Sequence, residues 1–105
     1  MNEITEELLA EFKERMKLSD DEDKNLTRIL SASVSDLIVK CGNHDVHTNH
    51  RFKELVFERS RYVYNDALEY FDNNFLSQML SLNLENALSS SSSTVEGETD
   101  ETKQI

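Results

Sequence analysis

The sequence predicts an all-α fold, a small bundle of about four helices with a long central helix and a disordered acidic C-terminal tail. Proline is absent and glycine occurs only twice in the 105 residues, so little interrupts a helix. No run of four residues alternates clearly between apolar and polar, as a half-buried strand would. The composition changes abruptly at Ser89. We therefore expect one helical domain, residues 1–88, followed by a Ser-rich acidic disordered tail, residues 89–105.

The first predicted helix runs from Ile4 to Lys17. Glutamates crowd its start, where the helix dipole favours negative charge, and Thr5 is a candidate for the cap. One face of the helix is apolar and is expected to be buried: Leu8, Leu9, Phe12 and Met16.

The second predicted helix begins in the acidic stretch after Lys17 and ends at Cys41. Ser19 followed by Glu22 matches a capping box, and Gly42 is the expected C-cap because glycine adopts positive φ without steric cost. A calcium loop is a weaker interpretation of the acidic stretch, because it lacks the glycine and the terminal glutamate at the required spacing. The expected buried face consists of Leu26, Ile29, Leu30, Val34, Leu37, Ile38 and Cys41.

The third predicted helix, residues 49–72, is the long central helix. Six of the chain's eight aromatic residues lie between Leu55 and Leu76. At about 100° per residue its apolar side chains cover an arc of about 160°, which is wide enough for neighbours on two sides. Asp72–Asn74 is expected to break or bend this helix, because these side chains compete for backbone hydrogen bonds.

Two apolar residues depart from the pattern of the central helix. Leu55 and Tyr62 fall on its acidic face, beside Arg59 and Asp66. An aromatic and an aliphatic residue flanked by opposite charges are typical of a protein-contact patch. We therefore predict that this patch is exposed.

The fourth predicted helix, residues 75–88, carries an apolar stripe that is expected to be buried. Leu82 lies off this stripe and is expected to be exposed. The members of the stripe are Leu76, Met79, Leu80, Leu84, Ala87 and Leu88.

One short polar segment has a regular spacing of possible metal ligands. Cys41, His44, His47 and His50 form a C-x2-H-x2-H-x2-H run, and thiolate and imidazole are the usual zinc ligands. A structural zinc site usually takes its ligands from two separated elements, whereas these four lie in one loop. We favour a solvated loop whose histidines titrate near neutral pH, with Cys41 as a core residue. Zinc is kept as the lesser alternative.

Charge and composition exclude several classes of function. A formal charge of −10 and the lack of basic clusters argue against nucleic-acid binding and against anionic membrane surfaces. A single cysteine allows no intramolecular disulfide, which fits a reducing compartment, and the acidic start is unlike a signal peptide. No motif suggests a nucleophile with its base or a phosphate-binding loop, so we expect neither an enzyme nor a cofactor.

Several segments of the chain together form a recognisable pattern. They are Leu8–Leu18 (LLAEFKERMKL), Ser19–Asp23 (SDDED), Lys40–Gly42 (KCG), Glu54–Phe71 (ELVFERSRYVYNDALEYF) and Asn74–Ser77 (NFLS), and the most specific part is Glu58–Glu69 (ERSRYVYNDALE). In these segments the chain resembles the head–tail connector (adaptor) proteins of siphovirus-type bacteriophages that infect Gram-positive hosts. The resemblance covers roughly residues 4–88.

This resemblance implies a structural virion protein that is assembled in the bacterial host cytoplasm. A homo-oligomeric ring of about twelve copies would bind beneath the portal protein, extend the DNA channel and dock the head-closure (stopper) or tail protein. DNA would pass through without sequence-specific binding, since an acidic lining does not hold phosphates. The expected subunit contacts are Val39, Leu55, Arg59, Tyr62 and Asp66. The expected portal contacts are Ser89, Val95 and Ile105 in the tail.

Two other functions fit the residues. One is an acidic helical regulatory module that binds a host protein, which predicts a stable monomer or dimer that is absent from virions. A zinc-dependent interaction module built on Cys41 and the three histidines would contain stoichiometric zinc.

Overall fold

The computed structural model describes residues 2–94, which form four α-helices and two short 3₁₀ turns. The helices are α1 (Glu6–Met16), α2 (Asp23–Cys41), α3 (His50–Tyr64) and α4 (Phe71–Thr94), and the 3₁₀ turns Asp20–Glu22 and Leu68–Tyr70 precede α2 and α4. Strands are absent from this part of the chain. The prediction of an all-α bundle is confirmed.

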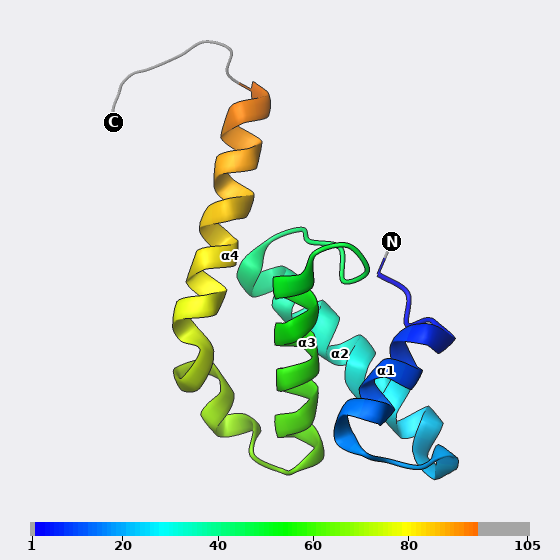
Figure 1. The fold of residues 1–105 in the computed structure, drawn as a ribbon. Helices are drawn as coiled ribbons and strands as arrows, with labels where there is room; N and C mark the ends of the chain where they lie inside the picture. Colours follow the sequence, from blue (N-terminus) through cyan, green and yellow to red (C-terminus); the bar gives the residue numbers. More distant parts are fainter. Residues whose placement is uncertain (1, 95–105) are drawn as a thin grey trace.

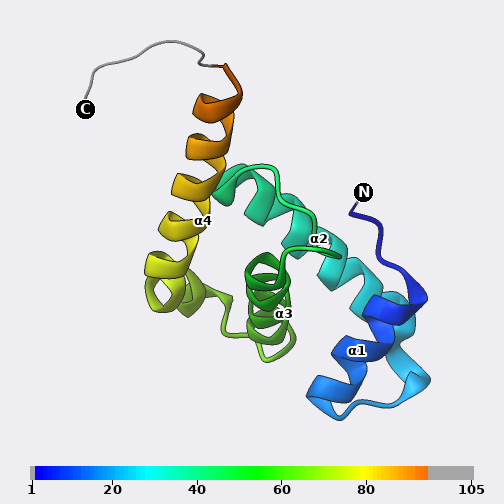
Figure 2. The ribbon, with the colours of Figure 1, turned by 45° about the horizontal axis from the view of Figure 1, so that its top comes forward.

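Helices α2 and α3 together form the centre of the bundle, because each of them contacts α1, α4 and the other. Figure 1 shows α1 on one side of α2, α3 across it, and α4 running beside α3 at the opposite edge. The C-terminal half of α4 extends past the ends of the other helices, and the turned view in Figure 2 shows the same projection. One end of the fourth helix therefore stands clear of the bundle.

The predicted helix ends in α1 and α2 are largely confirmed. The Thr5 hydroxyl accepts a hydrogen bond from the Leu8 amide at 3.1 Å, and α2 ends at Cys41 as expected. The capping box does not form, since the Ser19 side chain makes no capping bond and a 3₁₀ turn separates it from α2. The Glu22 carboxylate instead accepts a hydrogen bond from the Tyr64 hydroxyl, at 2.7 Å.

The predicted helix over residues 49–72 is wrong in its length, because the chain turns after Tyr64. Asp66 adopts the left-handed conformation at φ 57°, and the Ala67 amide donates to the Tyr62 carbonyl at 2.8 Å. The Asp66 amide donates to the Val63 carbonyl at 3.1 Å, which completes a Schellman motif. Aspartate tolerates this conformation better than most residues, so the helix ends there without glycine.

The core lies between α1, α2 and α3 and is closed by one side of α4. Phe12 of α1 packs against Phe57 of α3 with ring centroids 5.4 Å apart. All the residues predicted for the buried face of α2 are buried except Ile38, which is partly buried against the core. The largest fully buried side chains are Phe12, Phe52, Phe57, Phe71, Leu26, Leu30, Leu37 and Leu82.

The predicted disordered tail, residues 89–105, lies mostly outside the described residues. Helix α4 continues through its first six positions to Thr94. The predicted bend at Asp72–Asn74 appears one residue later, at Phe75, whose φ of −122° and ψ of 17° interrupt the helical geometry. Residues 95–105 are not described.

Candidate functional site

Helix α4 presents a row of leucines to the solvent. The side chains of Leu76, Leu80, Leu84 and Leu88 are 50%, 60%, 59% and 58% exposed, and they recur at every fourth position. At about 100° per residue these four span about 120° of the helix surface. We call this row the leucine ridge. Large apolar residues gathered on one exposed face are typical of a protein-binding surface.

The opposite side of α4 faces the bundle. Phe71, Met79 and Leu82 are buried, and Phe75 is partly buried against the core. The prediction for this helix is therefore wrong in its orientation, since Leu82 was expected to be exposed and the four ridge leucines to be buried. Of the predicted stripe, only Met79 lies inside.

Polar contacts from α2 and the loop after it fix this orientation of α4. Lys40 pairs with Asp72 at 3.0 Å, and the Asn83 side-chain Nδ2 donates to the Lys40 backbone carbonyl at 2.8 Å. The His44 ring Nε2 lies 3.0 Å from the carbonyls of both Cys41 and Leu82. Since a carbonyl only accepts, this nitrogen carries the proton and donates to them. These contacts fix the rotation of α4, so that the leucine ridge faces the solvent.

Glycine 42 allows the close approach of α4 to the end of α2. Its φ of 97° and ψ of −178° lie in a region that is almost restricted to glycine, rather than in the left-handed helical conformation of a simple cap. A Cβ atom at this position would lie 2.4 Å from the Cγ atom of Asn86. The Asn86 side chain in turn accepts a hydrogen bond from the Asn43 amide at 3.2 Å.

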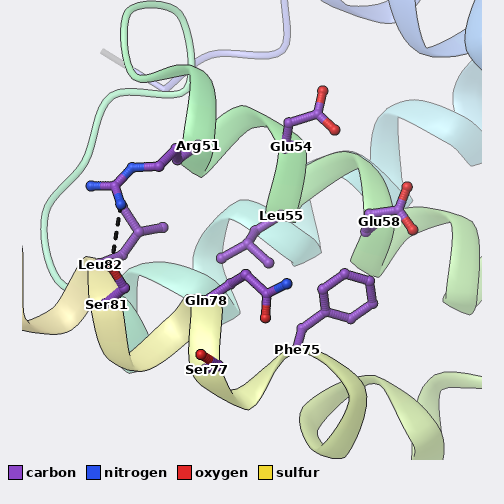
Figure 3. A pocket seen from close by; sticks show the side chains of 9 residues that line it. All are labelled: Arg51, Glu54, Leu55, Glu58, Phe75, Ser77, Gln78, Ser81 and Leu82. Atoms are coloured by element: carbon purple, nitrogen blue, oxygen red, sulfur yellow. Dashed lines mark hydrogen bonds between the residues drawn. The ribbon is translucent and has the colours of Figure 1, made fainter.

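A groove of about 480 Å³ lies between α3 and α4. Leu55, Phe75 and Gln78 face one another across it in Figure 3, with Leu82 at one end. Arg51 closes one edge, where it donates to the Ser81 hydroxyl at 3.2 Å and pairs with Glu85. We call this feature the α3/α4 groove. Its floor is apolar, whereas its α3 rim is charged.

The acidic rim of the groove is tied to α1. Arg15 donates to both carboxylate oxygens of Glu54 at 2.8 Å and to Glu58 at 3.0 Å. These hydrogen bonds lower the pKa of Glu54 below its ordinary value of 4.5, and they raise the pKa of Arg15. The Glu54 carboxylate therefore stays charged and paired near neutral pH.

The predicted subunit contacts do not gather on one surface. Val39 is 84% exposed and Asp66 is exposed, but Leu55 is only 3% exposed, because α4 turns back across α3 and covers it. Arg59 is also held inside, since it donates to Ser33 at 3.0 Å and to Asp36 at 3.2 Å. The prediction that Leu55 and Arg59 belong to an exposed patch is therefore wrong.

Tyr62 is partly buried rather than free. Its ring packs edge-on against Phe71 and Phe75, with centroids 5.7 Å apart in both pairs, and its hydroxyl accepts from Asn74 at 3.0 Å. Of the predicted portal contacts, Ser89 lies exposed on α4. Val95 and Ile105 lie outside the described residues.

Three of the four candidate zinc ligands, Cys41, His44 and His47, are engaged elsewhere, whereas His50 is exposed at the start of α3. Burial raises the pKa of the Cys41 thiol from 9.0 to about 11, so the thiolate that zinc needs is disfavoured. His44 bonds to two carbonyls, and the His47 ring lies 2.8 Å from the Glu3 carbonyl. Within residues 2–94, no three His, Cys, Asp or Glu side chains are grouped to hold a metal ion.

Sequence reasoning missed the ridge, although a signal for it is present. Phe75, Met79 and Leu82 follow the spacing i, i+4, i+7, which forms a second apolar stripe on the same helix. Only one of two apolar stripes on a helix can pack into the core, and the other stays exposed. On α4 the stripe of Phe75, Met79 and Leu82 packs inside, and the leucine ridge is exposed.

No protein-family model matches the chain, and no curated protein or solved structure shows significant similarity to it. In the part of the chain that the structure describes, no helix combines the length and the apolar character needed to cross a membrane.

Proposed function

We propose that this protein is a structural head–tail connector subunit of a bacteriophage virion, which works by binding other proteins rather than by chemistry. The observation that carries the proposal is the leucine ridge, an uncharged apolar face on a helix that projects from the bundle (Figure 1). The segment Glu58–Glu69, in which the chain resembles such connectors, forms the end of α3 and the turn into α4. The resemblance thus falls on the residues that redirect the chain into the exposed helix.

The proposed assembly is a ring of about twelve copies beneath the portal protein, facing the stopper or tail protein on its other side. The chain carries a formal charge of −10, so a channel lined by several copies repels the DNA phosphates and does not retain them. A small bundle whose fourth helix is only half covered gains stability from such neighbours. The site of action is the head–tail interface of the virion.

The test is association with the portal protein encoded in the same genome. The purified chain is mixed with intact portal rings, and native mass spectrometry counts the copies bound. We expect one connector copy per portal subunit. Leu84→Ser should lower the bound copies at least tenfold, because it removes an exposed apolar contact from the centre of the ridge.

A matched control is Ala32→Ser, which also places serine on an exposed helix face, on α2 away from the ridge. This variant should bind like the unaltered chain. Intact portal rings that bind no copies would contradict the connector function. In that case the acidic regulatory module becomes the better candidate, and capture of a host protein by the leucine ridge is its test.

A further inference from the structure

The leucine ridge and the α3/α4 groove are two different apolar surfaces on the same helix. The four ridge leucines and the groove-lining residues of α4 are centred about 130° apart around its axis, at about 100° per residue. A two-fold dimer needs only one self-complementary patch. Two unlike surfaces that point in different directions instead suit a head-to-tail contact, in which each copy uses one surface toward each neighbour.

The charges of α4 favour a second copy of the chain as the occupant of the groove. Asp72 and Glu85 are the only charged residues of the helix, and both are paired within the chain, with Lys40 and with Arg51. The ridge itself carries no charge, although the whole chain carries −10. A cationic partner would find no anion on the ridge. Another copy can approach through the ridge without bringing unpaired carboxylates together.

The groove has the chemistry to receive leucines. Its lining is apolar: Leu55 and Leu82 are buried beneath it and Phe75 is partly buried, while the serines and Gln78 of α4 add only neutral groups beside them (Figure 3). The carboxylates of Glu54 and Glu58 at the rim are already bonded to Arg15, so an apolar occupant leaves no carboxylate without its partner. A leucine entering here exchanges water for apolar contacts on both sides.

We infer that the leucine ridge of one copy packs into the α3/α4 groove of the next copy. This head-to-tail contact rests on the connector function proposed above, in which copies of the chain assemble side by side. Four half-exposed leucines form a small interface, so the contact is weak between two free copies. It strengthens where a portal ring holds many copies at high effective concentration.

The test is cross-linking between two differently tagged variants, both carrying Cys41→Ala to remove the chain's single native thiol. One variant carries Leu84→Cys on the ridge, and the other carries Gln78→Cys in the groove. They are mixed without portal at the highest concentration that remains in solution, and a short bismaleimide links nearby thiols. We expect the mixed ridge–groove product to exceed the product of Leu84→Cys with a Ser31→Cys control at least tenfold.

Ser31 is exposed on α2 and lies on neither surface. The yield of cross-links between Leu84→Cys and Ser31→Cys therefore measures random collisions. Predominant linking of Leu84→Cys to itself would overturn the inference, because it indicates a two-fold contact of ridge on ridge. A mixed yield no higher than the Ser31→Cys control would overturn it as well. Portal binding is measured separately, so a portal-bound ring without ridge–groove links refutes this contact alone. Links without portal binding refute the connector function alone.

Discussion

Single polar residues determine where α4 lies. His44 comes from a polar loop, yet its side chain is buried between the end of α2 and α4. The Asn49 amide lies 3.3 Å from its Nδ1, while the oxygen of the same side chain caps α3 by accepting from the Phe52 amide at 3.1 Å. One histidine thus links three elements, because each of its ring nitrogens has a protein partner.

Cys41 gives a prediction at the same scale. Burial raises the pKa of its thiol from 9.0 to about 11, so the unfolded chain loses this proton at lower pH than the folded chain. The resulting stability is fully present below pH 9.0, is lost as pH rises toward about 11, and changes no further above that. At about 1.4 kcal/mol per pKa unit the loss reaches about 2 to 3 kcal/mol.

Cys41→Ala removes this ionisation and leaves every other titrating group in place. Urea denaturation from pH 8 to about pH 11, followed by circular dichroism, gives the free energy of unfolding of both proteins. We expect the unaltered chain to lose about 2 kcal/mol more than the variant over this range. Parallel pH profiles would show that the thiol is solvated.

At the scale of elements, the two faces of α4 have opposite roles, and two leucines of this helix test them. Leu82 is 1% exposed and Leu84 is 59% exposed. Leu82→Ala should lower the free energy of unfolding by about 2 to 4 kcal/mol, because it leaves a cavity in the core. Leu84→Ala should change it by less than about 0.5 kcal/mol. Urea denaturation at neutral pH measures both, and the reverse order would mean that the ridge faces inward.

Helices with a single apolar stripe were predictable from the sequence. The buried faces of α1 and α2 follow from a regular spacing over several turns, and Thr5 and Cys41 mark boundaries close to those observed. In these helices only one face can enter a core, so the period determines the packing. The fold class was predictable for the same reason.

The candidate site was not predictable, because local pattern does not determine which way the chain turns. The pattern of residues 49–72 predicts one continuous helix. The turn that interrupts it after Tyr64 depends on the left-handed conformation of Asp66. After this turn α4 covers Leu55, which the isolated pattern places on an outer face. With two apolar stripes on α4, the buried one is selected by contacts with distant residues such as Lys40 and His44.

At the scale of the whole molecule, the chain is strongly acidic, but its leucine ridge is an uncharged apolar surface. Fully burying a leucine contributes about 1.5 to 3 kcal/mol, so completing the burial of four half-exposed leucines contributes about 3 to 7 kcal/mol. The loss of translational and rotational freedom on association costs about 4 to 15 kcal/mol. Two free copies are therefore expected to associate only marginally, and a template that holds many copies is needed for a stable ring.

The balance between the uncharged ridge and the charge of −10 gives the last prediction, which concerns salt. Copies that meet through apolar surfaces still repel each other through the rest of their charge, and salt screens that repulsion. Raising the ionic strength from about 0.01 M to about 0.3 M shortens the screening length from about 30 Å to below 10 Å. Self-association of the free chain, measured by sedimentation equilibrium, should therefore increase with salt, whereas Leu84→Ser should remain monomeric at both ionic strengths. An association that weakens as salt rises would instead mean that ion pairs between copies hold them together, which the uncharged ridge cannot provide.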